Sequence, residues 1–361
     1  MSKVYFTDLS SGSKEDNLPH RIETLFRKAG DGLEYEEDDI VSLKLHFGEK
    51  GIDTFIRPVQ VNPIIKAVKN AGGKPFLGDS NTLYTGSRSN AVDHHMTAQE
   101  NGWVRPVVEA PVVIADGLHG NEFYEVEVNG KHFDDVKIGA AFYQADGIIG
   151  VSHFKGHMMT GFGGTLKNLG MGCASRAGKL MMHYDVKPEV DLEKCIGCGR
   201  CKIWCPADAI EVDDKAEIDL GECIGCGECK IVCPEGAIKV EDSSSNVELQ
   251  EKISEFAHGS LLGKYDKSMF FNFVMDVTPE CDCPPWRSYP MVPDIGIVAS
   301  KDPVAVEQAA FDLVKDEKGR DYDSGVDKFR EEHDVDPTAQ IVHAEKIGMG
   351  EREYELIDIS E

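Results

Sequence analysis

The strongest constraint on this chain is a cysteine pattern that occurs twice near the middle of the sequence. The first run has the spacing C-x2-C-x2-C-x3-C-P and extends from Cys195 to Pro206; the second repeats it from Cys223 to Pro234. The two runs are displaced by 28 residues. Thiols at such close spacing can point at one centre, which is typical of metal-ligating sites and not of a disulfide framework.

The two runs resemble those of bacterial-type ferredoxins, in which three cysteines of each run bind one [4Fe–4S] cluster and the fourth binds the other. The resemblance implies a first cluster on Cys195, Cys198, Cys201 and Cys233. It implies a second cluster on Cys223, Cys226, Cys229 and Cys205. Four isoleucines are expected to line the clusters and exclude water: Ile196, Ile203, Ile224 and Ile231. The alternative, two structural zinc sites, predicts tetrads without the trailing Cys-Pro.

The composition is that of an acidic globular protein. Of 361 residues, 41% are hydrophobic and 28% charged, and the formal net charge is −26. This excess argues against nucleic-acid or membrane partners, because long-range repulsion would slow every encounter with an anionic surface. It suits docking to a basic patch on a redox partner protein, such as a ferredoxin, a flavodoxin or an oxidoreductase subunit, although a solvated acidic surface is the simpler explanation.

The N-terminal residues contain no apolar core of signal-peptide length. No stretch approaches the ~18 apolar residues that a membrane helix needs. We therefore expect a cytoplasmic protein, a compartment in which cysteines stay reduced. The eleven cysteines are accordingly interpreted as metal ligands or free thiols.

Outside the cysteine runs, strand-like and helix-like segments alternate. Strands are predicted at 40–47, 74–77, 111–115, 147–152, 269–277, 295–299 and 341–343. Helices are predicted at 15–29, from an Asn62 N-cap with Pro63 to Gly72, at 247–262, and from an Asp302 N-cap. This alternation predicts an α/β fold with a mostly parallel sheet covered by helices.

The cysteine runs interrupt this alternation, which resumes after them. We therefore expect one discontinuous α/β domain, formed by residues 1–187 and 241–361. An inserted α+β domain of the two-cluster ferredoxin type is expected at 188–240.

A glycine-rich stretch follows the predicted strand that ends at Ser152. It contains the histidines and lysines His153, Lys155, His157 and Lys167. Loops at the carboxyl ends of parallel strands are where α/β proteins bind ligands, and glycines let the backbone approach a ligand closely. We predict that His157 and Lys167 are catalytic. The predicted cofactor-binding residues are Gly161, Gly163, Gly164 and Asn168. The alternative is a surface loop with a structural histidine.

Other polar residues follow earlier strands. Lys44 with His46, and Asp79-Ser80-Asn81, end two predicted strands and so are candidates for the same crevice, although a structural role explains them more simply. The pair His94–His95 lies in a polar helical stretch and is expected to face solvent.

Three segments resemble the DUF362 family, in its subset with an inserted two-cluster ferredoxin. They are GFGGTLKNLGMGC at 161–173, ECDCP at 280–284, and residues 293–306. The resemblance covers most of residues 40–315 and implies an architecture without implying a reaction. The chain is also distantly similar to the catalytic domain of nickel-dependent lactate racemases, where a histidine does acid/base work and a lysine tethers a pyridinium-derived cofactor. His157 and Lys167 match that pattern, while the region 78–84 contains no second histidine. From this we take a related fold and no activity.

Cys173, Cys281 and Cys283 lie outside the runs. A Cys-x-Cys pair has a metal-ligand spacing and strains a direct disulfide. If Cys173 joins the pair, three thiolates could hold a third iron–sulfur cluster or a metal, with His157, His153 or His183 as a fourth ligand. The alternative is three unrelated buried thiols.

These observations lead to three functional hypotheses. The first is an iron–sulfur oxidoreductase, in which the inserted domain supplies low-potential electrons to a small-molecule site in the α/β domain. The second is an electron-transfer adaptor subunit of a larger redox complex. The third is an assembly protein that donates clusters or metal to other proteins.

Overall fold

The computed structural model describes residues 1–10, 12–13, 16–83, 86–183, 188–205, 208–220, 222–223, 228–239, 245–284 and 286–360. A single eight-stranded sheet lies at the centre of the α/β domain, in the order β16-β1-β15-β14-β7-β2-β3-β4. Its strands are β1 (Ser2–Thr7), β2 (Ile40–Lys44), β3 (Lys74–Asp79), β4 (Val112–Ile114), β7 (Gly147–His153), β14 (Met269–Val274), β15 (Gly296–Ser300) and β16 (Tyr354–Asp358). Only β15 runs antiparallel to its neighbours in this sheet. The predicted α/β class with a mostly parallel sheet is confirmed.

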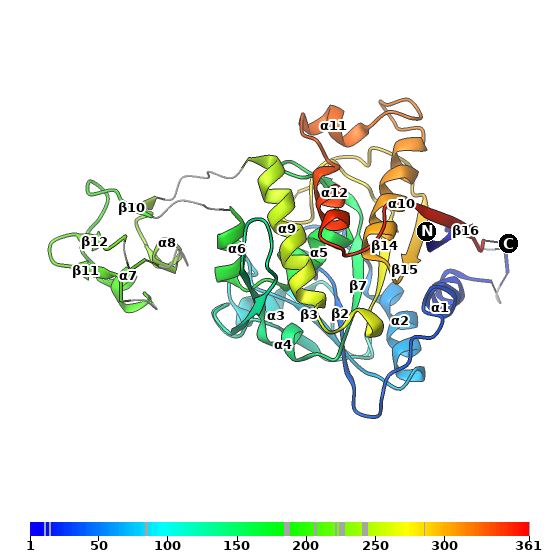
Figure 1. Cartoon of the computed structure of the whole chain (residues 1–361), viewed down its shortest axis with the longest axis horizontal. Helices are drawn as coiled ribbons and strands as arrows, with labels where there is room; N and C mark the ends of the chain where they lie inside the picture. The colour runs from blue at the N-terminus through cyan, green and yellow to red at the C-terminus, as the bar shows by residue number, and fades with distance from the viewer. Residues whose placement is uncertain are drawn as a thin grey trace.

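Helices cover both faces of this sheet (Figure 1). The helices are α1 (Leu18–Ala29), α2 (Pro58–Asn70), α3 (Ala91–Glu100), α4 (Ala140–Gln144), α5 (Thr165–Cys173), α6 (Arg176–His183), α7 (Arg200–Ile203), α8 (Glu228–Val232), α9 (Asn246–Leu261), α10 (Pro303–Asp316), α11 (Lys328–His333) and α12 (Ala339–Lys346), with a 3-10 turn at Tyr265–Lys267. The short two-stranded sheets are β5 (Phe123–Glu127) with β6 (Asp135–Gly139), β8 (Lys155–His157) with β9 (Gly161–Gly163), β10 (Glu189–Val190) with β13 (Ile238–Lys239), and β11 (Ile210–Val212) with β12 (Ala216–Ile218).

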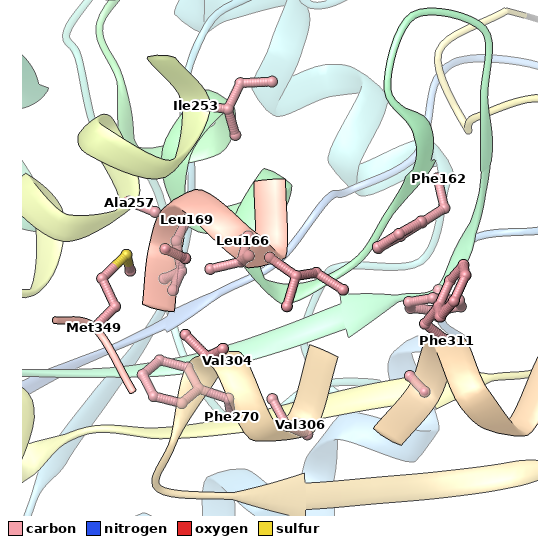
Figure 2. Close-up of a cluster of buried hydrophobic side chains, with 14 of the residues drawn as sticks. Phe162, Leu166, Leu169, Ile253, Ala257, Phe270, Val304, Val306, Phe311 and Met349 are labelled. Atoms are coloured by element: carbon pink, nitrogen blue, oxygen red, sulfur yellow. The ribbon is translucent and has the colours of Figure 1, made fainter. Parts of the chain in front are cut away.

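Two apolar cores follow from the period-two alternation of the buried strands. Phe270 of β14 faces the core beneath α5, α9, α10 and α12, while its neighbour Phe271 faces the core beneath α1 and α2. Figure 2 shows the first of these cores, in which Phe162 and Leu166 lie near Phe311 of α10 and Ile253 of α9. Both faces are buried, and β7 and β14 are accordingly buried along their whole length and largely apolar, as is typical of parallel strands of this kind.

The sheet joins chain segments from both sides of the cysteine runs. Strand β7 precedes the runs and pairs in parallel with β14, which follows them, with Ile149 opposite Met269. Helices α5 and α9 also pack together across the same interruption, where the Gly170 Cα lies against the Ile253 backbone. One sheet is therefore built from residues on both sides of the cysteine runs.

Two sequence predictions of local structure were wrong. Helix α2 begins at Pro58 and not at Pro63, which lies inside it, because Pro58 already supplies a favourable first helical residue. The Asn62 amide instead donates to the Val107 carbonyl at 2.6 Å. Residues 341–343 belong to α12 and not to a strand, because Ile341 is buried in a helical stripe against the domain core.

The smaller elements between residues 188 and 239 form a lobe beside the α/β domain, which we call the cysteine lobe (Figure 1). Its core contains Ile210 and Ile238 from its two-stranded sheets. That Ile203 lines a cluster stays a prediction; its side chain is 80% exposed. Ile196 borders a small cavity but is 62% exposed; Ile224 and the Ile231 side chain lie outside the described residues. No helix in the described part of the chain is long and apolar enough to span a membrane.

Candidate functional site

A cavity of about 290 Å3 opens at the carboxyl ends of β2, β3 and β7. Each of these strands ends in a polar residue that reaches the cavity, namely Lys44, Asp79 and His153. The rest of the lining comes from the β8–β9 hairpin, α5, α6, α9 and the loop that holds Cys281 and Cys283. The crevice predicted for Lys44, His46, Asp79 and Ser80 is therefore present, together with the predicted His157 and Lys167.

One side of the cavity is a network in which the positive charges are already paired, and we call it the paired wall. The Lys44 ammonium donates to Asp79 at 3.0 Å, to Asn168 at 2.9 Å and to the Leu45 carbonyl at 3.1 Å. Arg88 donates to the same Asp79 carboxylate at 3.5 Å. Burial alone would raise the pKa of Asp79, but the nearby Lys44 charge outweighs it and holds that pKa well below its usual range.

Lys179 of α6 extends the paired wall. Its ammonium donates to the carbonyls of Asn81 at 2.7 Å and Ala174 at 3.0 Å, and to the Ser80 hydroxyl. Burial lowers the pKa of Lys179 to about 8. An ammonium group has three N–H donors, and in Lys44 and Lys179 all three are used within the protein. These two lysines therefore contribute positive charge to the cavity but no hydrogen bond to a ligand.

His94 belongs behind this wall, against the sequence prediction that it faces solvent. Its side chain is fully buried, and Nε2 lies 3.5 Å from Asp79. Burial lowers the pKa of His94 to about 4. The polar sequence around it gave no sign of this position, because the partner Asp79 comes from a separate strand.

Other cavity residues keep donors that the described residues do not use, and we call His157 and Lys167 the open wall. The Nδ1 atom of His157 accepts hydrogen bonds from the backbone N–H groups of Met159 and Thr160, both at 3.2 Å. The Nδ1 atom of His46 accepts from the Gly48 N–H at 3.0 Å. In both neutral rings the proton is therefore on Nε2. Burial and then the charge of Lys167 hold the pKa of His157 well below its usual range.

Lys167 is the cation of the open wall. Its amine makes no hydrogen bond or ion pair to any residue that the structure describes, and burial lowers its pKa. The neighbouring Lys155 donates to the His153 carbonyl at 2.9 Å and lies 3.5 Å from Asp282. A ligand in the cavity would therefore meet Lys167 before any other cation.

The middle residue of the Cys-x-Cys pair fixes this loop. The fully buried Asp282 accepts from the Thr54 hydroxyl at 2.7 Å and pairs with His153 Nδ1 at 2.8 Å. With Asp282 held inward, Cys281 and Cys283 line the cavity. The hydrogen bond from Cys281 holds the pKa of the Cys283 thiol well below its usual range, so the pair shares one proton.

The predicted three-cysteine site is not formed. Cys173 ends α5 in the domain core, where burial raises the pKa of its thiol to about 12, and it does not line the cavity of Cys281 and Cys283. Within the described ranges, no group of three or more His, Cys, Asp or Glu side chains is arranged to hold a metal ion. Two of the three candidate histidines also do not suit a fourth ligand. A ligating ring donates its other N–H, whereas His157 accepts at Nδ1 and His153 uses both nitrogens, on Asp282 and on the Met275 carbonyl.

The predicted cofactor-binding glycines have packing roles of their own. A Cβ on Gly163 would meet the Lys167 stem, and a Cβ on Gly164 would meet Glu307. Gly161 has a φ of +73° and lies against Pro337. Of the three, only Gly164 lines the cavity.

Asn168 faces the cavity as predicted, but its amide is occupied. It donates to the carbonyl of Lys44 at 3.0 Å and to the Ser152 hydroxyl at 3.0 Å, which ties α5 to β2 and β7. We therefore assign it to positioning the site and not to contacting a cofactor.

Glu307 of α10, which the sequence did not suggest, holds the amino end of α5. Its carboxylate accepts from the backbone N–H groups of Thr165 at 2.7 Å and Leu166 at 3.1 Å, and from the Asn272 amide at 2.9 Å. Burial raises the pKa of Glu307 to about 7. Because Lys167 follows Thr165 by two residues on the same helix, this contact determines where the Lys167 side chain enters the cavity.

The cysteine lobe has its own small cavity. Four of the predicted ligands line it: Cys195, Cys198, Cys201 and Cys233. The Cys205 and Cys233 sulfurs each accept a backbone N–H from four residues later, Ala209 at 3.3 Å and Ala237 at 3.2 Å. The Ala216 N–H lies 3.4 Å from the Cys195 sulfur and lowers the pKa of that thiol. Cys229 is buried and Cys223 half-buried, and Cys226 lies outside the described residues.

Residues 41–312 match the family model described as "Domain of unknown function (DUF362)", which is more than half of the chain. The chain belongs to the DUF362 family. No curated protein matches it. This family membership agrees with the resemblance seen in the sequence, and the description of the family names no reaction.

Two solved structures are similar to this DUF362 chain at low identity. The lactate racemase apoprotein from Thermoanaerobacterium thermosaccharolyticum is 13% identical, with a TM-score of 0.38, and the match covers 76% of this chain and 51% of the racemase. A protein from Thermotoga maritima is 10% identical, with a TM-score of 0.33, covering 80% of this chain and 57% of that one. The DUF362 chain thus spans about half the length of the racemase.

Proposed function

We propose that this DUF362 protein is an iron–sulfur oxidoreductase, in which the cysteine lobe holds two [4Fe–4S] clusters and the cavity of the α/β domain binds the molecule that is reduced. When bound, the clusters would supply single low-potential electrons received from a redox partner protein. The single observation that carries this proposal is which cysteines line the small cavity in the cysteine lobe.

Three cysteines of the first run share that cavity with Cys233, which belongs to the second run. Crossed ligation requires this grouping, whereas two independent zinc tetrads would each be built from one run. The N–H groups that point at the Cys205 and Cys233 sulfurs occur at the same place in both halves of the repeat. Such donors stabilise thiolates, and these cysteines are the donor set that iron–sulfur clusters use, although the described residues are not gathered into a group that could hold a metal ion.

The open wall suits reduction of a small molecule that develops negative charge. The Nε2–H group of His157 can donate a hydrogen bond to an oxygen on which charge accumulates. The Lys167 ammonium, which has no partner in the described residues, can donate a proton to the reduced product. The paired wall adds a positive field without contacting the substrate, and Ile253 with Leu249 limits the access of water.

The test is metal analysis of protein purified without oxygen. We expect about eight irons and eight sulfides per chain, the content of two cubes. Cys198→Ser is expected to remove about half of the iron and one of two interacting EPR signals, because each cysteine serves one cluster. Cys173→Ser and Cys283→Ser serve as matched controls and are expected to leave iron and EPR signals unchanged.

A colourless wild-type protein that takes up no iron on reconstitution, or stoichiometric zinc in its place, would refute the proposal. Iron near twelve per chain, with one third lost in Cys283→Ser, would restore the third cluster that the structure does not form. Transfer of iron from the protein to an added apo-protein would favour the third hypothesis, an assembly protein.

A further inference from the structure

The cysteine lobe and the α/β domain meet through an aromatic contact. The Trp204 ring, at the end of α7, lies 5.1 Å from the His119 ring, at an interplanar angle of 81°. Trp204 falls between the predicted ligands Cys201 and Cys205, and His119 lies in the α/β domain between β4 and β5. An edge-to-face pair of this kind is an established stabilising geometry.

The internal repeat of the lobe is broken at this residue. The two runs are otherwise closely alike around their last cysteine, with Cys-Lys-Ile-Trp-Cys-Pro in the first and Cys-Lys-Ile-Val-Cys-Pro in the second. Trp204 thus stands where the second run has Val232. The same cysteine spacing occurs with valine in the second run, so the larger ring is not required by the cysteine pattern itself.

His119 is fixed on its own side of the contact. Its carbonyl accepts from the Arg176 guanidinium at 3.1 Å, and the Arg176 N–H donates to the Gly120 carbonyl at 3.1 Å. Gly120 has a φ of +81°, and a Cβ there would collide with the Arg176 side chain. The 119–120 turn is therefore clamped to the first residue of α6.

Helix α6 connects this contact to the cavity. It begins at Arg176, and three residues later Lys179 joins the paired wall; His183, at its end, also lines the cavity. We propose that Trp204 docks the cysteine lobe on the His119 turn and thereby fixes which face of the lobe addresses α6 and the cavity. The docking contact does not require a bound cluster. A role for this contact in electron transfer from the cysteine lobe to the cavity rests on the proposed function.

The experiment is hydrogen exchange of the full-length protein, with Trp204→Val as the test variant, because valine is the natural residue of the other run. Trp204→Phe is the matched control that keeps a ring. In Trp204→Val we expect the amides of Arg176 and Glu122 to exchange about two- to tenfold faster, the range set by the loss of one aromatic pair. Trp204→Phe is expected to exchange like the wild type.

His119→Ala attacks the contact from the α/β side and leaves the cysteine runs intact. It is expected to accelerate exchange at residues 200–205 by a similar factor, and the double variant His119→Ala/Trp204→Val is expected to add nothing further. Unchanged exchange in both single variants, or additive effects in the double variant, would overturn the docking proposal. Iron analysis of the same samples keeps the outcomes separate, because an iron-free wild type refutes the clusters while the docking contact stays measurable by exchange.

Discussion

The pairing of Glu307 with the amino end of α5 predicts a stability that falls as pH rises. Burial raises the pKa of this carboxyl to about 7 in the folded chain, against an ordinary value of 4.5. The folded protein therefore holds a proton between these two values that the unfolded chain has released. This contribution is fully present below about pH 4.5 and is lost as pH rises through about 7.

The magnitude follows from the difference between the two pKa values. Each pKa unit is worth about 1.4 kcal/mol, so the full contribution is about 3 kcal/mol. Glu307→Gln has no proton to lose, and it keeps an oxygen for Thr165 and Asn272 while placing an amide opposite the Leu166 N–H. We expect it to be less stable than the wild type at pH 4.5 and to recover about 3 kcal/mol relative to it by pH 8.

The assay is equilibrium urea unfolding of both proteins between pH 4.5 and 8, followed by the fluorescence of the buried Trp103. Glu255→Gln is the matched control, since Glu255 is also buried but accepts from three backbone N–H groups and from His343. Burial opposes ionisation there, but those donors outweigh it and lower the pKa of Glu255. Its contribution is lost as pH falls, the opposite sign. A difference in unfolding free energy between wild type and Glu307→Gln that does not change with pH would show that Glu307 stays charged at the helix end. That result would refute the reasoning.

Two further predictions concern stability and are checked by urea unfolding. Lys44→Met removes the nearer of the two cations that pair with the buried Asp79, leaving Arg88 at 3.5 Å, and is expected to cost about 3 kcal/mol. Lys167→Met removes an amine that burial disfavours and is expected to leave stability unchanged or higher. Equal losses would contradict the division into paired and open walls. Gly170→Ala forces a Cβ against the Ile253 backbone and is expected to cost about 1–3 kcal/mol, while Gly12→Ala, which has open space, is the control and is expected to cost nothing measurable.

Local sequence signals predicted local structure well. The Asp302 cap followed by Pro303 begins α10 as expected, and the Asp302 carboxylate accepts from the Val304 N–H at 2.8 Å. Where two signals compete within a few residues, as with Pro58 and Pro63, the earlier one sets the helix start and the later one is tolerated. The short apolar run at Ile341 fits a strand or a helix equally, and packing against the domain core decided it.

The candidate site was predictable only for the residues at the carboxyl ends of strands. Lys44 and Asp79 end neighbouring parallel strands, so their meeting follows from the topology. The role of Glu307 does not, because it reaches α5 from a helix about 140 residues later in the chain. The glycines were assigned to a ligand because the sequence cannot show that Lys167 and Glu307 already occupy the space beside them.

The packing of α5 against α9 has a consequence for biosynthesis. Gly170 leaves the ribosome well before Ile253, and the whole cysteine lobe is made between them. Until α9 emerges, the apolar side of α5 has no cover, and β14 cannot yet extend the sheet beyond β7. The lobe is therefore synthesised while the neighbouring α/β domain is still half built.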